Sequence, residues 1–139
     1  MVLNNKRLSW EKYALKIAEV ASLRSEDIRK VGCCALDFDH RVIGVAYNGL
    51  ASGKSVDESF WLDRDKRRPY MIHAEANLLS LFRRNECKLI ACTLLPCQAC
   101  ATMIAAYGIK KVIYKDIYEL DIKALDIFKF YNIECIKLD

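Results

Sequence analysis

The sequence predicts an α/β fold, in which one central mixed five-stranded sheet has helices on both faces as a three-layer α/β/α sandwich. Two observations support this prediction. From residue 73 onward, segments with helical apolar spacing alternate with short strand-like segments rich in Val, Ile, Leu and Cys, a pattern typical of α/β domains. Ahead of them, two strand-like runs separated by a short turn indicate a β-hairpin.

The N-terminal third of the chain predicts one helix followed by the hairpin. Ser9 is a good N-cap residue, and apolar residues recur at helical spacing after it as far as Ala21. Residues 31–38 and 41–47 are rich in Val, Ile and Cys. The turn Asp39-His40 joins these two runs, so we interpret His40 as a turn residue.

Segment 48–70 has weak periodicity and contains Gly49, Gly53 and Pro69. A loop of this length inside a compact domain is usually either functional or disordered. We predict that it is functional.

The C-terminal half predicts three helices and three strands in alternation. The helices are residues 73–84, 97–107 and 119–131, and the strands are residues 88–94, 110–115 and 133–138. Gly108 would end the second of these helices. His73 and Cys97 would then both lie at helix N-termini, each directly after an extended segment.

The residues that indicate chemistry are His73-Ala74-Glu75 and Pro96-Cys97-Gln98-Ala99-Cys100. One imidazole and two thiolates suit zinc, and three protein ligands leave a fourth position for water, as in catalytic zinc sites. Zinc lowers the pKa of such a water to about 7, and Glu75 would move the protons as a general acid–base group. His-x-Glu followed by Pro-Cys-x-x-Cys is the arrangement found in zinc nucleobase deaminases.

The spacing within each motif is compatible with one metal ion. Cys97 and Cys100 are three residues apart and share one helix face, so both can reach the same ion. His73 and Glu75 are two residues apart and would line opposite sides of a helix end. Metal and substrate would lie between them.

Two other interpretations of the same residues stay open at this point. A Cys-x-x-Cys pair on its own also matches a redox motif. A closed structural zinc site would need a fourth ligand, for which Cys92, Cys87 or His40 could serve. Glu75 would then be an ordinary solvated helix residue.

The composition favours one globular domain comprising residues 1–139. The chain is 53% hydrophobic and 29% charged, and it is long enough to bury a core. It has no apolar run near the roughly 20 residues of a membrane helix, and residues 1–6 lack a signal-peptide pattern. Seven cysteines cannot all pair, and a reducing compartment would leave the metal ligands free. We therefore expect a cytoplasmic protein.

The net charge of +4 suits an anionic substrate such as a nucleotide, but it does not demand a nucleic-acid partner. Two clusters of basic side chains could meet phosphate: Arg64, Lys66, Arg67 and Arg68, and Arg24, Arg29 and Lys30. For the first cluster, a solvated loop surface is an equally good interpretation.

Segments outside the metal motifs also follow one another in an order that resembles the deoxycytidylate deaminases. They are Ser9-Trp10-Glu11, Leu23-Arg24-Ser25-Glu26-Asp27, Val31-Gly32, Ala46-Tyr47-Asn48-Gly49, Pro69-Tyr70 and Thr93-Leu94-Leu95. Cytidine nucleoside deaminases differ, because they have cysteine where this chain has His73. The tRNA adenosine deaminases usually have methionine where this chain has Gln98-Ala99, and they lack the Tyr-Asn-Gly segment.

The resemblance implies a cytidine-deaminase-like fold and roles for individual residues. Asn48 would bind the sugar 3′-hydroxyl, and Arg24 and Ser25 would meet the 5′-phosphate. The backbone of Ala74 would donate to the pyrimidine oxygen, and Tyr118 would lie near the nucleotide. For Arg24, a cation at a helix C-terminus is the alternative interpretation.

The implied activity is zinc-dependent hydrolysis of dCMP to dUMP and ammonia, which would supply dUMP for thymidylate synthesis. Members of the family form hexamers and are often activated by dCTP and inhibited by dTTP, which implies effector contacts at Asn48, Gly49 and Gly53. Lys54 stands where many relatives have a cysteine that helps to hold a second zinc. We therefore expect one zinc ion per chain.

Two further functions stay open. The same site could deaminate dCTP or another cytosine nucleotide. A nucleic-acid-binding or tRNA-editing module is a different class, and it would need aromatic stacking platforms beside a basic groove. Phe60, Trp61 and Tyr70 could serve either class, but we expect a nucleotide substrate, no membrane association and no nucleic-acid partner.

Overall fold

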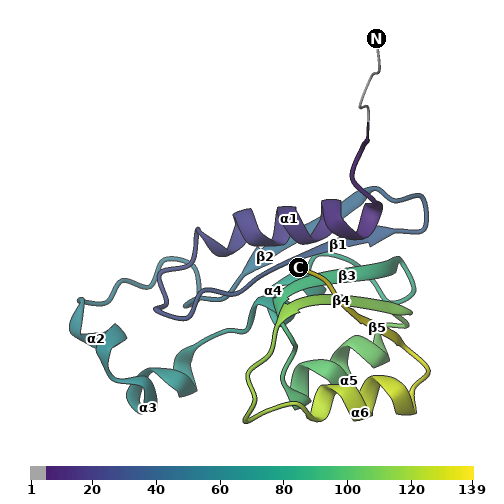
Figure 1. Cartoon of the computed structure of the whole chain (residues 1–139). Coiled ribbons are helices and arrows are strands. Elements are labelled where there is room, and N and C mark those ends of the chain that lie inside the picture. The colour runs from purple at the N-terminus through teal and green to yellow at the C-terminus, as the bar shows by residue number, and fades with distance from the viewer. Residues whose placement is uncertain (1–5) are drawn as a thin grey trace.

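The computed structural model describes residues 6–139, so the expectation about a leader sequence lies largely outside the described residues. The predicted α/β fold with a mixed five-stranded sheet is confirmed (Figure 1). The strands are β1 (Gly32–Asp37), β2 (Val42–Tyr47), β3 (Cys87–Leu94), β4 (Lys111–Asp116) and β5 (Glu134–Lys137). Their order is β2-β1-β3-β4-β5, antiparallel around β1 and parallel from β3 to β5.

Helices cover both faces of this sheet. They are α1 (Trp10–Ser22), α2 (Ser59–Leu62), α3 (Arg64–Arg67), the 3₁₀ helix η1 (Arg68–Tyr70), α4 (Ala74–Leu79), α5 (Gln98–Ala106) and α6 (Lys123–Phe130). Figure 1 shows α1 on one side of the sheet and α5 and α6 on the other. The N-terminal start of α1 is the predicted one, because the Ser9 side chain accepts a hydrogen bond from the Lys12 amide at 3.2 Å.

Two hydrophobic cores result from the alternation of side chains along the strands. Cys34 and Leu36 of β1 pack with Leu15 of α1. Their neighbours Cys33 and Ala35 face the opposite way, into the larger core beneath α4, α5 and α6. Because both faces are covered, the inner strands are apolar at nearly every position.

The structure differs from the predicted elements in three places. Segment 48–70 contains the short helices α2, α3 and η1. The helix predicted over residues 73–84 ends at Leu79. The apolar spacing continues beyond it because Phe82 packs on the core from a turn, with its ring centroid 6.0 Å from that of Tyr107. The helix predicted to begin at residue 119 begins at Lys123, and Leu120 is 84% exposed rather than part of an apolar helix face.

Two expectations from composition concern cysteines and membranes. All seven cysteines are free thiols. Among residues 6–139, no helix combines the length and the apolar character that crossing a bilayer requires.

Candidate active site

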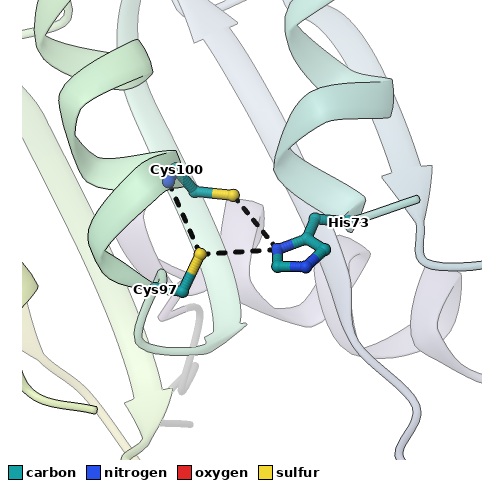
Figure 2. A group of neighbouring side chains, drawn as sticks. All are labelled: His73, Cys97 and Cys100. Carbon is teal, nitrogen blue, oxygen red and sulfur yellow. Dashed lines mark hydrogen bonds between the residues drawn. The ribbon is translucent and has the colours of Figure 1, made fainter. Parts of the chain in front are cut away.

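His73, Cys97 and Cys100 converge at the adjacent N-termini of α4 and α5 (Figure 2). The Nδ1 atom of His73 lies 3.4 Å from the Cys97 sulfur and 3.3 Å from the Cys100 sulfur. Ligand atoms about 2.0–2.3 Å from a tetrahedral zinc lie roughly 3.5 Å apart, so these three residues fit the ion. Within residues 6–139 they form the one such group of three or more potential ligands.

Local backbone structure explains how two distant motifs meet. His73 and Cys97 are the N-cap residues of α4 and α5, and both have extended backbone conformations. The segment between β3 and α5 is anchored to β4 by the Leu95 amide, which donates to the Asp116 carbonyl at 2.8 Å. Each cap therefore projects its side chain from the end of a helix that rests on the same face of the sheet.

The thiols differ in their electrostatic environment. Hydrogen bonds from Cys100 and His73 lower the pKa of Cys97 well below its ordinary value, which favours the thiolate form of this residue. The bond that Cys100 shares with Cys97, together with burial, raises the pKa of Cys100. The hydrogen bond to Cys97 also raises the pKa of His73. A divalent cation would favour the deprotonated form of all three ligands.

Glu75 lies in the first turn of α4 and is only 4% exposed. Burial raises its pKa to about 7, against the opposing effects of its backbone hydrogen bond and the nearby His73. A carboxyl group that titrates close to neutral pH can both accept and release a proton there. Glu75 and His73 line the same cavity.

This cavity has a volume of about 220 Å³, and its lining includes four arginines: Arg29, Arg64, Arg67 and Arg68. Asn48, Ala74 and Tyr118 all line it; their predicted contacts with a nucleotide stay predictions. Arg24 and Ser25 are not part of its lining. Arg24 is exposed elsewhere, and the hydroxyl of the buried Ser25 donates to the Asn48 carbonyl at 2.9 Å.

Two of the arginines that line the cavity are Arg29 and Arg64. Their guanidinium carbons lie 4.3 Å and 5.4 Å from the centre of the Tyr118 ring. The Arg64 Nη2 atom is also 3.3 Å from the Tyr118 hydroxyl. Both arginines belong to the basic clusters of the sequence, which was the one available signal, but sequence spacing did not single them out.

Asn48 is held by the backbone of the loop that precedes β1. Its Oδ1 atom accepts from the Val31 amide at 2.9 Å, and its Nδ2 atom donates to the Arg29 carbonyl at 2.9 Å. Gly49 pairs with Ile72, and Gly53 has a left-handed backbone with φ of 87°. Open space surrounds the position of a Cβ atom at both glycines.

The alternative ligands proposed for a closed zinc site lie apart from the three metal-binding residues. His40 stacks on Trp10, with ring centroids 4.8 Å apart. The Cys87 thiol donates to the Leu89 carbonyl at 3.3 Å, and Cys92 pairs with Cys33 across β1 and β3. None of them joins the group described above among residues 6–139, so the arrangement is that of an open site.

Comparison with known proteins identifies relatives along most of the chain. The family model for the cytidine and deoxycytidylate deaminase zinc-binding region matches residues 8–116. Human deoxycytidylate deaminase is 32% identical over 117 residues, which cover 77% of this chain and 65% of the human protein. The chain thus matches less than two thirds of the length of its mammalian relatives. Deoxycytidylate deaminase of Mycobacterium phage D29 is 36% identical over 78% of this chain and 95% of its own length.

A solved structure of a dCMP deaminase has the same fold as this chain. The dCMP deaminase of cyanophage S-TIM5, in complex with dCMP and dUMP, superimposes with a TM-score of 0.78 and 25% identity. The match covers 96% of this chain and 100% of the phage protein. Together with the His73, Cys97 and Cys100 geometry, these matches establish a zinc-binding region. The chain belongs to the cytidine and deoxycytidylate deaminase family.

Proposed function

We propose that this chain hydrolyses dCMP to dUMP and ammonia, and so supplies dUMP for thymidylate synthesis. One observation carries the proposal: a buried carboxyl group, Glu75, shares a cavity with a three-residue zinc site. The relatives add support, because proteins named deoxycytidylate deaminase match this chain in both sequence and fold.

His73, Cys97 and Cys100 would hold the Zn²⁺ ion, which when bound acts as a Lewis acid that makes water acidic enough to ionise near neutral pH. A carboxylate oxygen of Glu75 takes the proton that the attacking water loses as its oxygen bonds to C4 of cytosine. Glu75 delivers that proton to ring atom N3. It then takes the proton of the new hydroxyl group on C4 and passes it to the amine, so that the C4–N bond breaks, ammonia leaves and the C4 carbonyl of dUMP forms.

Backbone and amide groups would orient the base and the sugar. The Ala74 amide is one of the first N–H groups of α4, and these groups have no carbonyl within the helix to donate to. It is free to donate to the O2 atom of the pyrimidine. One lone pair of the Asn48 Oδ1 atom remains after its bond to the Val31 amide, and this can accept the sugar 3′-hydroxyl.

Arg29 and Arg64, rather than Arg24 and Ser25, would meet the 5′-phosphate. Their position beside Tyr118 at the cavity supports this assignment. A guanidinium group can donate two parallel hydrogen bonds to a phosphate, and stacking on the Tyr118 ring limits the orientations that each side chain can adopt.

Other features of the family are also part of this proposal. The chain would form one catalytic domain, assemble as a homohexamer and function in the cytoplasm. Exposed apolar side chains of α1 and of its C-cap residue support assembly; they are Trp10, Tyr13 and Val20 in the helix and Leu23 at its C-cap. Control by dCTP and dTTP would act through Asn48, Gly49 and Gly53, where two glycines leave open space.

The proposal is tested by measuring ammonia release from dCMP, dCTP, deoxycytidine and a cytosine-containing oligonucleotide. Wild type and Glu75→Gln are compared, with the zinc content of each determined in parallel. We expect wild type to prefer dCMP. Glu75→Gln should retain zinc but lose a factor of about 10²–10⁴ in kcat, the usual contribution of general acid–base catalysis.

Two results would contradict the proposal. Zinc-loaded wild type that releases ammonia from none of the four compounds excludes deaminase activity on cytosine. Full activity of Glu75→Gln excludes the role of Glu75 and leaves the zinc site intact.

A further inference from the structure

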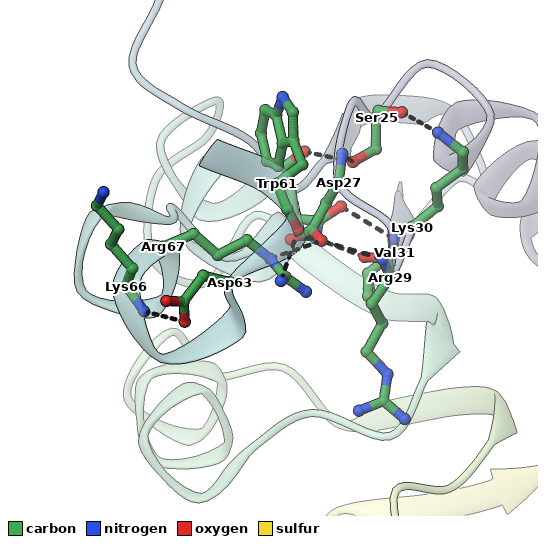
Figure 3. A network of polar contacts seen from close by, with 10 residues as sticks. Ser25, Asp27, Arg29, Lys30, Val31, Trp61, Asp63, Lys66 and Arg67 are labelled. Atoms are coloured by element: carbon green, nitrogen blue, oxygen red, sulfur yellow. Dashed lines mark hydrogen bonds and ion pairs between the residues drawn. The ribbon is translucent and has the colours of Figure 1, made fainter. Parts of the chain in front are cut away.

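Arg67 differs from the basic residues around it. Arg64, Lys66 and Arg68 are exposed, whereas Arg67 is 8% exposed and points into the protein (Figure 3). Its Nη1 atom donates to the Trp61 carbonyl at 2.9 Å, and its Nε atom lies 3.2 Å from the Oδ1 atom of Asp27. A buried guanidinium requires such partners, because an uncompensated buried charge is costly.

Asp27 is the centre of a second set of contacts. It is 6% exposed, and its Oδ1 atom accepts a hydrogen bond from the Arg29 amide at 3.0 Å. Its Oδ2 atom lies 3.5 Å from the Asn48 Nδ2 atom, and its own amide donates to the Ser25 hydroxyl at 3.2 Å. The carboxylate thus fixes the backbone of the loop on which Arg29 stands.

The ion pair joins two segments that are far apart in the sequence. One segment is the loop of residues 25–31, which carries Arg29, and the other is residues 59–70, which carries Arg64. Arg64 lies in the same short helix, α3, as Arg67. In Figure 3 the Arg29 side chain extends away from the ion pair, and both Arg29 and Arg64 reach the Tyr118 ring.

We infer that Asp27 and Arg67 are positioning residues, whose buried ion pair sets the separation of Arg29 and Arg64 for the phosphate of the nucleotide. The inference rests on the proposed function. A buried ion pair adds little stability compared with apolar residues of similar size, but it is directional, and losing one partner leaves the other charge unpaired. The two arginines therefore depend on this ion pair. Because Asp27 and Arg67 also line the cavity, variants must separate positioning from a direct contact of Arg67 with the phosphate.

Four variants test this inference: Arg67→Met, Asp27→Asn, the double variant, and Lys66→Met as the control. Asn at position 27 keeps an acceptor for the Arg29 amide but removes the charge. Lys66 lies in the same helix and carries the same charge, but its side chain is exposed and outside the cavity lining. Zinc content and the melting temperature identify any variant that fails to fold.

Kinetics on two substrates distinguish a loss of phosphate binding from damage to the whole active site. For dCMP, we expect each single variant to raise KM roughly tenfold with kcat changed less than about threefold. The double variant should be no worse than either single one, because both remove the same link. For deoxycytidine, which lacks the phosphate, KM should not change. Lys66→Met should match wild type, and Arg67→Lys should recover part of the loss.

Hydrogen exchange gives a measurement that does not depend on activity. Amides in residues 25–31 and 59–70 should exchange roughly tenfold faster in Arg67→Met and in Asp27→Asn, since the ion pair that joins the two segments no longer opposes their local opening. Amides of β3 should keep their protection. If wild type turns over no cytosine nucleotide, the proposed function fails, and exchange alone decides whether the pair links the two segments.

Three outcomes would overturn the inference. If Arg67→Met raises KM for dCMP but Asp27→Asn does not, Arg67 contacts the phosphate directly. If KM rises equally for dCMP and deoxycytidine, the variants damage the site as a whole. If exchange in both segments stays at the wild-type rate, the ion pair does not hold them together.

Discussion

Cys97 and Cys100 are one helical turn apart, yet their thiols respond in opposite ways to their surroundings. Hydrogen bonds from Cys100 and His73 lower the pKa of Cys97, whereas the bond shared with Cys97 and burial raise that of Cys100. A thiolate beside an imidazole favours the binding of a cation, and the bound cation then favours ionisation of the second thiol.

Replacing one of these ligands should release the metal. Loss of a group that only orients a metal ligand weakens metal binding by about 10–100-fold. Cys97→Ser removes a direct ligand, so its affinity for zinc should fall by more than that. Cys135→Ser is the matched control, because this half-buried thiol lies in β5, outside the metal-binding group. Metal analysis after gel filtration checks both variants, and a full complement of zinc in Cys97→Ser would contradict the assigned ligand set.

Single residues also show what a sequence can and cannot reveal. His73, Cys97 and Cys100 were predictable because their residue types and order match a known zinc-binding pattern, and because the spacing of Cys97 and Cys100 lets both reach one ion. Arg67 was not distinguishable from Arg64 among four basic residues in five positions. The direction of its side chain depends on Asp27, forty residues earlier in the chain, and no local pattern records that contact.

Helix α1 and strand β1 approach each other closely at Gly32. A Cβ atom there would overlap the Ala18 carbonyl oxygen and lie 2.5 Å from the Ser22 amide nitrogen. Glycine inside a strand often marks such a close approach of two backbones. The contact explains why this position of the β1 strand carries no side chain.

Gly32→Ala should therefore destabilise the protein by about 1–3 kcal/mol, the usual cost of overpacking a core. Urea unfolding at neutral pH measures the change. Gly49→Ala is the control, because no atom lies within 4 Å of the added Cβ position, and it should change the free energy of unfolding much less. Equal effects of the two substitutions would exclude close packing of α1 on β1.

An ion pair also connects α1 to the sheet. The Lys111 ammonium lies 2.9 Å from Glu11, and this hydrogen bond lowers the pKa of Glu11 below its ordinary value of 4.5. Because the folded state has the lower pKa, the pair stabilises the protein above pH 4.5 and ceases to do so as pH falls through the folded pKa. The contribution is small, since both side chains remain partly exposed.

Glu11→Gln should remove this part of the pH dependence. The loss of unfolding free energy between about pH 6 and about pH 3 should be smaller than in wild type, by less than about 1 kcal/mol. Glu58→Gln serves as the control, because Glu58 is exposed at the start of α2 and caps nothing with its side chain. An unchanged pH dependence in Glu11→Gln would show that the pair does not stabilise the fold.

Element boundaries were harder to predict than the elements themselves. The start of α1 followed from Ser9, but the end of α4 did not follow from periodicity. Apolar residues continue to Phe82 because a turn, rather than a helix, brings that ring to the core. Asn85 then has a left-handed backbone with φ of 70°, which lets the chain reverse toward β3.

On the scale of the whole molecule, one sheet brings the two metal motifs together. Helices α4 and α5 both pack on the face that contains the larger core. Their N-termini therefore lie close together although the two motifs are far apart in the sequence. The alternation of helices and strands predicted one sheet with helices on both faces. The apolar strands support the same prediction, because strands covered on two faces are apolar throughout. The alternation could not predict the lining of the cavity, because many of the lining residues lie in loops whose positions depend on tertiary contacts.

Zinc held by His73, Cys97 and Cys100 should support the conversion of dCMP to dUMP. The most direct test measures this conversion by chromatography in zinc-loaded protein, after removal of zinc by a chelator, and after zinc is restored. We expect activity in the first sample, its loss in the second and its recovery in the third. Full conversion by the zinc-free protein, or none by the zinc-loaded protein, would contradict the claim.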